Sequence, residues 1–162
     1  MGTTSSFGDD FVMDVTIRTA VPSDMDALVR LLGILFSIES DFRPDPVRQR
    51  QGVALMLAAP EQRTVLVAEY AGDVVGMVTG QLVVSTAEGG RSLLVEDMVI
   101  EAAHRRLGIG RLLLAAVDNW ARARGATRLQ LLADRENVRA LRFYEQMGLR
   151  STQLMCLRCG GT

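Results

Sequence analysis

The sequence predicts an α/β domain in which a mixed, largely antiparallel β-sheet carries helices on both faces. Segments of strand and helix periodicity follow one another in the order β-α-α-β-β-β-α-β-α-β. The helix between the fourth and fifth strands makes these two strands parallel, because a crossover of that length returns the chain in the same direction. With 162 residues, one hydrophobic core needs no disulfide or metal to support it. We therefore expect a flexible leader over residues 1–13 and a single domain over residues 14–162.

Each element has its own local signal. Alternating polarity predicts strands, and apolar residues three or four apart predict helices. Pro22-Ser23-Asp24 marks a helix start, Pro60 and Gly125 mark helix ends, and Ala71-Gly72-Asp73 is a hairpin turn. The predicted elements are strands 14–18, 64–70, 74–84, 92–100, 128–132 and 153–157, and helices 22–40, 47–58, 109–124 and 137–148.

Composition restricts the function classes. The chain has 18 basic and 19 acidic side chains and is 48% hydrophobic, which is typical of a folded domain without a general affinity for nucleic acid. No apolar stretch is long enough to span a membrane. Cys156 and Cys159 alone make neither a disulfide framework nor a complete zinc site. We expect a cytoplasmic protein with reduced cysteines, no metal, and no nucleic-acid or membrane partner.

Residues 95–112 join an apolar strand, a basic glycine loop and an amphipathic helix without interruption. Gly108 and Gly110 allow the backbone to approach a ligand, and the first turn of the following helix offers unpaired N–H groups. Arg105, Arg106 and Arg111 add positive charge. Because no Gly-Lys-Ser/Thr follows the glycines, a P-loop hydrolase is excluded. The segment predicts a phosphate-binding loop.

Three stretches together resemble the GNAT superfamily of N-acetyltransferases. They are Arg105-Arg106-Leu107-Gly108-Ile109-Gly110, the segment from Asn137 to Leu149 containing Phe143-Tyr144, and Ile17-Arg18-Thr19-Ala20 followed by Pro22-Ser23-Asp24. The resemblance covers residues 15–157 and implies a sheet of six to seven strands and transfer of an acetyl group from acetyl-CoA to a primary amine. Only 14 residues follow Gly148. They leave room for one strand, or for a strand completed by a partner subunit, and a homodimer is compatible with this.

The resemblance also implies site residues. Glu96 corresponds to a glutamate that acts as general base, and Tyr144 to a tyrosine that protonates the leaving thiolate. Acetyl-CoA would be held by the backbone of the strand and loop and by one asparagine: Met98, Val99, Ile100, Arg105, Arg106, Leu107, Gly108, Ile109, Gly110, Arg111 and Asn137. Strand alternation places Asp97 on the opposite face from Glu96, which makes it the weaker candidate base.

Each of these residues also has a structural interpretation. Glu96 could only bind the cationic substrate, Tyr144 could pack on the sheet, Asn137 could be a helix N-cap, and the arginines could be solvated. A non-catalytic acyl-CoA-binding module on the same fold is the alternative function.

The amine acceptor is not identified by any motif. Its pocket would be formed by residues 39–48, residues 85–91 and the C-terminal strand, where Glu39, Asp41 and Glu88 could attract a cation. His104, the only histidine, is predicted to be a surface loop residue.

Overall fold

The computed structural model describes residues 14–160, so the predicted leader over residues 1–13 lies outside the described residues. The strands are β1 (Val15–Thr19), β2 (Arg63–Tyr70), β3 (Asp73–Ser85), β4 (Gly90–Ile100) and β5 (Ala126–Leu131). The α-helices are α1 (Met25–Ile38), α2 (Pro46–Leu57), α3 (Ile109–Arg122) and α4 (Val138–Gln146), with short 3-10 turns at Pro22–Asp24 and Ala102–His104.

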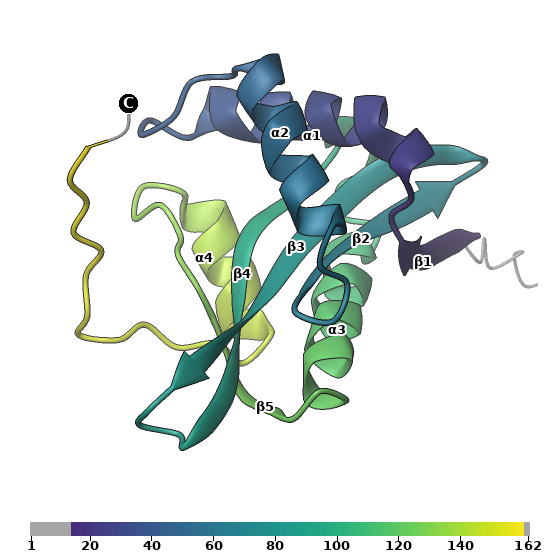
Figure 1. Ribbon diagram of the computed structural model, residues 1–162. Coiled ribbons are helices and arrows are strands. Elements are labelled where there is room, and N and C mark those ends of the chain that lie inside the picture. The colour runs from purple at the N-terminus through teal and green to yellow at the C-terminus, as the bar shows by residue number, and fades with distance from the viewer. Residues whose placement is uncertain (1–13, 161–162) are drawn as a thin grey trace, which may run out of the picture.

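The strands form one sheet in the order β1-β2-β3-β4-β5. Neighbouring strands from β1 to β4 are antiparallel, and β5 runs parallel to β4. α1 and α2 cover one face of the sheet, and α3 packs on the other (Figure 1). The predicted fold class, the hairpin and the parallel crossover are confirmed.

The helices divide the hydrophobic core into two layers. On the α3 face, buried strand residues pack against the apolar stripe of α3, among them Val78, Val95, Leu113 and Val117. On the opposite face, α1 and α2 bury a second set that includes Leu28, Leu31, Val53, Met77 and Val99. The layer in which a strand residue packs therefore shows to which face of the sheet its side chain points.

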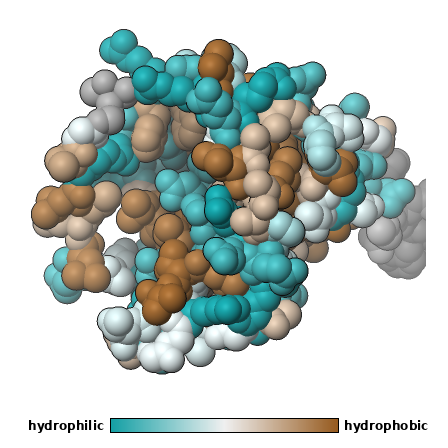
Figure 2. All heavy atoms as spheres, in the orientation of Figure 1, coloured by the Kyte–Doolittle hydropathy of each residue, from teal (hydrophilic) through white to brown (hydrophobic). Residues whose placement is uncertain are grey.

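Two predictions about the C-terminal region are wrong. The described sheet has five strands rather than six to seven, and residues 153–157 form no strand. Their apolar run, Leu154-Met155-Cys156-Leu157, is compatible with an extended chain, but a strand also needs a hydrogen-bonded neighbour. Leu154 and Leu157 are 89% and 85% exposed. Figure 2 shows hydrophobic side chains along this stretch, which stands apart from the body of the molecule.

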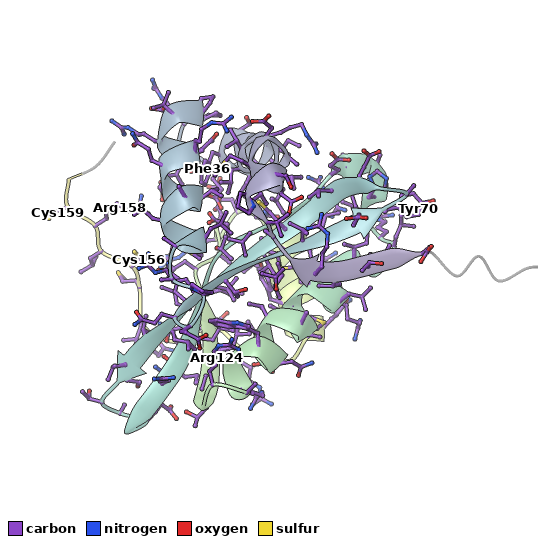
Figure 3. The ribbon with its side chains drawn as sticks, turned by 45° about the vertical axis from the view of Figure 1, so that its right-hand side comes forward. Phe36, Tyr70, Arg124, Cys156, Arg158 and Cys159 are labelled. Carbon is purple, nitrogen blue, oxygen red and sulfur yellow. The ribbon has the colours of Figure 1, made fainter. Side chains whose placement is uncertain are left out.

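The C-terminal stretch returns to the corner between α1 and α2. The Arg158 guanidinium lies 4.6 Å from the ring centroid of Phe42, and Phe42 packs on Phe36 of α1. Figure 3 shows Cys156, Arg158 and Cys159 on this stretch, and both cysteines are free and exposed. Within residues 14–160, no helix has the length and apolar character needed to cross a membrane.

Candidate active site

The phosphate-binding loop predicted from the sequence leads directly into α3. Gly108 is the N-cap of α3 and has φ of +79°, a conformation that costs glycine little and other residues more. The first helical hydrogen bond joins the Leu112 amide to the Gly108 carbonyl. The amides of the first turn before Leu112 therefore have no partner within the helix, and they lie at the positive end of its dipole.

Close packing places this helix end against the end of β4. A Cβ atom on Gly110 would lie 3.2 Å from side-chain atoms of Ile100 and Met98 and 3.3 Å from Phe143 of α4. Close approach therefore favours glycine at residue 110, whereas the backbone conformation favours it at residue 108.

The three arginines of the loop have different environments. Arg105 donates from Nε to the Ile100 carbonyl at 2.9 Å, which ties the loop to the end of β4. Arg106 and Arg111 are exposed, and Arg106 has φ of +66°. No acidic residue lies in the first turn of α3. The loop therefore keeps its positive charge beside the free amides.

A second set of contacts fixes the start of the same loop. Glu101 pairs with Arg30 of α1, and its other carboxylate oxygen lies 3.2 Å from Nδ1 of His104. The ring centroids of His104 and Tyr70 are 5.5 Å apart. With 23% of its side chain exposed, His104 is a partly buried support of the loop and not the surface residue that we expected.

β4 and β5 separate beside the loop. Their parallel pairing ends at Val95 and Leu131, so the last residues of β4, including Met98, Val99 and Ile100, have no β5 neighbour. On their other side these residues remain paired with β3. The β5-facing edge of β4 is thus open at the point where the loop begins.

The separation coincides with a β-bulge in β4. Val78 pairs with Met98 and Gly80 with Val95, so the single residue Thr79 lies opposite both Glu96 and Asp97. Val95 and Met98 pack in the same core layer, on the α3 face, although they are three residues apart. The two residues between them therefore share the other face, which is the face of α1 and α2.

The bulge overturns the expectation that Asp97 points away from Glu96. Simple alternation fails because the extra residue reverses the side-chain direction of the rest of the strand. Thr79 Oγ1 donates to Asp97 Oδ2 at 3.1 Å and accepts from the Asp97 amide at 2.9 Å. The structure thus places two further polar residues, Thr79 and Asp97, beside Glu96. The available sequence signal was the pair of adjacent acids within an apolar strand.

Burial and neighbouring negative charge raise the pKa values of two carboxyl groups at this point, Asp97 and Glu39. Burial raises the pKa of Asp97 to about 6, the Thr79 hydrogen bond opposes this rise, and the charge of Glu96 adds to it. Glu39, which caps the C-terminal end of α1, also has a raised pKa because of burial and the negative charge of Asp97. Further negative charge comes from Asp134, Asp41 and Glu96. Within residues 14–160 no ion pair joins Glu39, Glu96 or Asp97 to a basic side chain.

α4 carries the two remaining predicted residues, Tyr144 and Asn137, and brings Tyr144 to the same region. Burial raises the pKa of Tyr144, and the negative charge of Glu39 raises it further, so the phenol and that carboxylate lie near each other. Tyr144 makes no hydrogen bond with other residues of the described chain. Asn137 caps α4, accepting from the Ala140 amide at 3.1 Å. Its side-chain N–H groups remain available to a ligand.

Two other features lie away from this region. Glu88, predicted to attract a cation, accepts instead from Arg128 at 3.2 Å and from Thr127 at 3.0 Å. A cavity of about 450 Å³ lies beside the start of α1 and the β2–β3 turn, lined in part by Arg30, Tyr70 and Glu101. It contains none of the predicted cofactor or catalytic residues. Among residues 14–160, no three His, Cys, Asp or Glu side chains form a group suited to a metal ion.

Comparison with known families and proteins identifies the family of this chain. Residues 31–149 match the profile of the acetyltransferase (GNAT) family, and the chain therefore belongs to that family. It is 33% identical over 88 residues to streptothricin acetyltransferase from Streptomyces lavendulae, covering 54% of this chain and 44% of that protein. It is 43% identical over 54 residues to L-ornithine N5-acetyltransferase NATA1 from Arabidopsis thaliana, covering 33% of this chain and 24% of that protein. The chain thus matches less than half the length of these relatives.

The fold is also found among solved structures. Aminoglycoside N-acetyltransferase AAC(6')-Iy, determined in complex with CoA, superposes with a TM-score of 0.80 and 15% identity, covering 94% of this chain and 98% of that chain. Likeness at this identity shows that the two proteins share a fold.

Proposed function

We propose that the protein is an acetyl-CoA-dependent N-acetyltransferase that transfers an acetyl group to a primary amine of a small molecule, peptide or protein by direct attack on the thioester. One observation carries the proposal. Where β4 separates from β5, the N-terminal end of α3, the open edge of β4 and the carboxylates of Glu96 and Asp97 lie close together. Membership of the acetyltransferase family supports the proposal.

The residues present fit coenzyme A. The free amides of the α3 first turn suit a pyrophosphate, and Arg106 and Arg111 add positive charge without a competing acid in that turn. The open edge of β4 offers backbone groups of Met98, Val99 and Ile100 to an extended amide-containing arm. The side-chain N–H groups of Asn137, the N-cap of α4, make no hydrogen bond within the described residues and could also bind the cofactor. When bound, acetyl-CoA supplies an acyl group activated as a thioester.

The amine must lose a proton before it can attack. An alkyl ammonium has a pKa of about 10.4, so at neutral pH it enters as a cation. The carboxylates of the bulge attract this cation, and Glu96, which is exposed, meets it first. We propose that Glu96 takes the proton, which leaves a neutral amine aligned for attack.

The leaving thiolate must receive a proton. Tyr144 stays protonated at neutral pH because burial and Glu39 both raise its pKa. Its hydroxyl has no partner within the described chain and so can donate to a ligand. We propose that the Tyr144 O–H bond breaks as an S–H bond forms on the leaving thiolate, and that the tyrosinate then takes the second N–H proton from the acylated nitrogen, which restores the phenol.

The uncompensated carboxylates favour an acceptor that carries more than one positive charge. Glu39, Glu96 and Asp97 approach one another from α1 and β4 with no basic partner among residues 14–160. Ornithine, the acceptor in the name of one relative, carries a second amino group. A diamine or amino sugar is therefore the first class of acceptor to test.

Thiol release from acetyl-CoA tests the function directly. Purified protein is incubated with acetyl-CoA and a panel containing ornithine, polyamines, aminoglycosides and amino-terminal peptides, and product is verified by mass. Acetylation of at least one amine, with a cationic one preferred, is the expected result. Binding of coenzyme A without turnover of any amine would instead support the non-catalytic module.

We also propose that the protein is a homodimer. The exposed side chains of Leu154 and Leu157 and the outer edge of β5, which has no paired strand in the described sheet, favour a second copy as the covering partner. Light scattering after gel filtration is expected to give twice the monomer mass, and Leu154→Glu with Leu157→Glu is expected to give a monomer. A wild-type monomer at all concentrations would contradict this.

A further inference from the structure

The adjacent acids of the β4 bulge have unequal surroundings. Glu96 is exposed, whereas Asp97 is partly buried and is held at both its amide and its carboxylate by the Thr79 hydroxyl. Both side chains lie on the face of the sheet that α1 covers. Glu96, which can take a proton from a ligand at the surface, therefore has the less exposed carboxylate of Asp97 beside it.

We propose that Asp97 is the second proton acceptor of this site, receiving the acceptor amine's proton from Glu96 while Thr79 holds it in place. This inference rests on the proposed acetyltransferase function. Because Asp97 acts through Glu96, it is a positioning residue and does not itself touch the amine.

The proton transfers balance in two steps. The ammonium N–H bond breaks as an O–H bond forms on Glu96, which leaves a neutral amine and a neutral carboxylic acid. That O–H bond then breaks as an O–H bond forms on Asp97, and Glu96 regains its negative charge. After product leaves, Asp97 gives up the proton to solvent.

The electrostatics of the bulge support this order. Burial, with a smaller contribution from the charge of Glu96, raises the pKa of Asp97 to about 6, against the opposing Thr79 hydrogen bond. Such a carboxylate is mostly ionised at neutral pH and yet binds a proton more firmly than an ordinary aspartate, as a general base should.

The other titratable groups around the bulge are acids. Burial raises the pKa of Glu39 at the end of α1, and the negative charges of Asp97, of Asp134 after β5 and of Asp41 after α1 add to this rise. Burial also raises the pKa of Tyr144 of α4, and the charge of Glu39 adds to that rise. A bound cationic amine would lower the pKa of Asp97, so the pKa of this carboxyl is best measured in the free enzyme.

The test is the dependence of kcat/KM on pH, because this ratio reports the free enzyme. For the wild type we expect a decline below about pH 6. Thr79→Val removes the hydrogen bond that favours the charged form, so the decline should move about one pH unit upward. Thr79→Ser keeps the hydroxyl and should leave the profile unchanged. Asp97→Asn should abolish this decline and lower kcat at least about tenfold.

The outcomes separate the two proposals. If the wild type turns over an amine and neither Asp97→Asn nor Thr79→Val changes the pH profile, Asp97 has only a structural role. If the wild type binds coenzyme A and acetylates no amine, the proposed function itself fails. Thermal melts identify any loss of folding, and should Asp97→Asn unfold, the comparison of Thr79→Val with Thr79→Ser decides the matter alone.

Discussion

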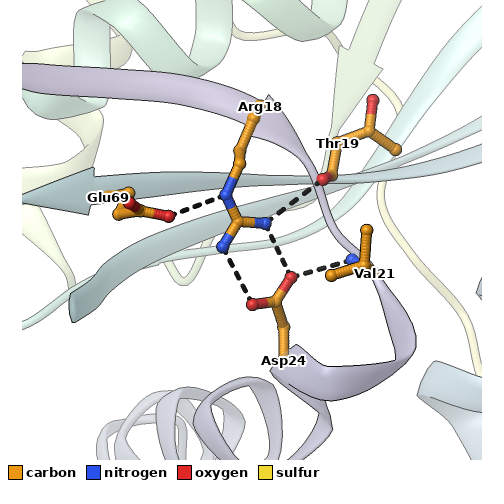
Figure 4. A network of polar contacts seen from close by, with 5 residues as sticks. All are labelled: Arg18, Thr19, Val21, Asp24 and Glu69. Carbon is orange, nitrogen blue, oxygen red and sulfur yellow. Dashed lines mark hydrogen bonds and ion pairs between the residues drawn. The ribbon is translucent and has the colours of Figure 1, made fainter. Parts of the chain in front are cut away.

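Arg18 donates to both carboxylate oxygens of Asp24, at 2.8 and 2.9 Å, and so ties β1 to the turn that begins α1 (Figure 4). The same guanidinium donates to Glu69 of β2 at 2.7 Å. Asp24 in turn accepts from the Val21 amide at 2.8 Å. One arginine thereby connects two strands and the first helical turn, and it holds the pKa of Asp24 below its usual value.

Asp24→Asn should destabilise the fold by about 2 kcal/mol at pH 7, because a buried charged hydrogen-bond partner is lost. The folded-state pKa of Asp24 is lowered, so its contribution is present above the unfolded pKa of about 3.9 and is lost as pH falls through the folded value. Urea unfolding at pH 7 and pH 3 should show a smaller difference between variant and wild type at the lower pH. Asp26→Asn, at a side chain that is 89% exposed, is the control; an equal loss there would refute this role of Asp24.

Glu96→Gln should lower turnover near pH 7 by roughly a hundredfold while coenzyme A binding stays unchanged, because the amide cannot take a proton from the ammonium. Steady-state kinetics with a saturating amine and calorimetric titration of coenzyme A measure the two effects. Glu88→Gln is the matched control, since Glu88 pairs with Arg128 away from the bulge. Unchanged turnover in Glu96→Gln would remove Glu96 from the mechanism.

Tyr144→Phe should reduce kcat by roughly a hundredfold without a comparable change in KM, because the phenol is needed after the amine is bound. The ratio of variant to wild-type rate should stay low across pH 6 to 9. The raised pKa keeps the phenol of wild-type Tyr144 protonated over that range, so the wild type retains its proton donor at each pH. Tyr70→Phe, which keeps the ring that packs on His104, should retain activity. An unaltered rate and pH profile in Tyr144→Phe would leave that residue a structural role.

Gly108→Ala should weaken coenzyme A binding through the backbone alone. Gly108 and Gly72 both have positive φ, +79° and +89°, and at either residue the position of an added methyl group has no neighbouring atom within 4 Å. Alanine at either site should therefore cost a similar conformational energy of about 1 kcal/mol. Only Gly108→Ala should raise the dissociation constant for coenzyme A, measured by calorimetry. Equal affinity in both variants would argue against the α3 amides as the binding group.

Most secondary structure was predictable because its signals are local. The apolar stripe of α3 and the glycine at its start suffice to predict a helix with an open N-terminal turn. The prolines around α2 and the short β2–β3 turn likewise fix element boundaries within a few residues. The pairing of β5 with β4 follows from the length of the intervening helix.

The direction of Asp97 was not predictable from alternation. A bulge depends on how β4 pairs with Thr79 of β3, and that pairing is a contact between residues 18 apart in the sequence. The prediction of a C-terminal strand was wrong for a related reason, since the apolar run that contains Leu154 and Leu157 lacks a paired neighbour in the described chain. Local patterns indicate which segments can extend, and long-range hydrogen bonds decide which become strands.

The single extra residue in β4 affects both the pair of acids, Glu96 and Asp97, and the packing of β4 against the start of α3. It turns Met98 and Ile100 toward α3, where both lie within 3.2 Å of the position that a Gly110 side chain would occupy. A deletion that restored regular alternation would therefore reverse the direction of one acid of the pair and also change the side chains that pack against the start of α3. A change in the length of the strand between Val95 and Met98 would therefore disturb both the pair Glu96 and Asp97 and the packing of Met98 and Ile100 against Gly110, whereas a substitution would change only one side chain.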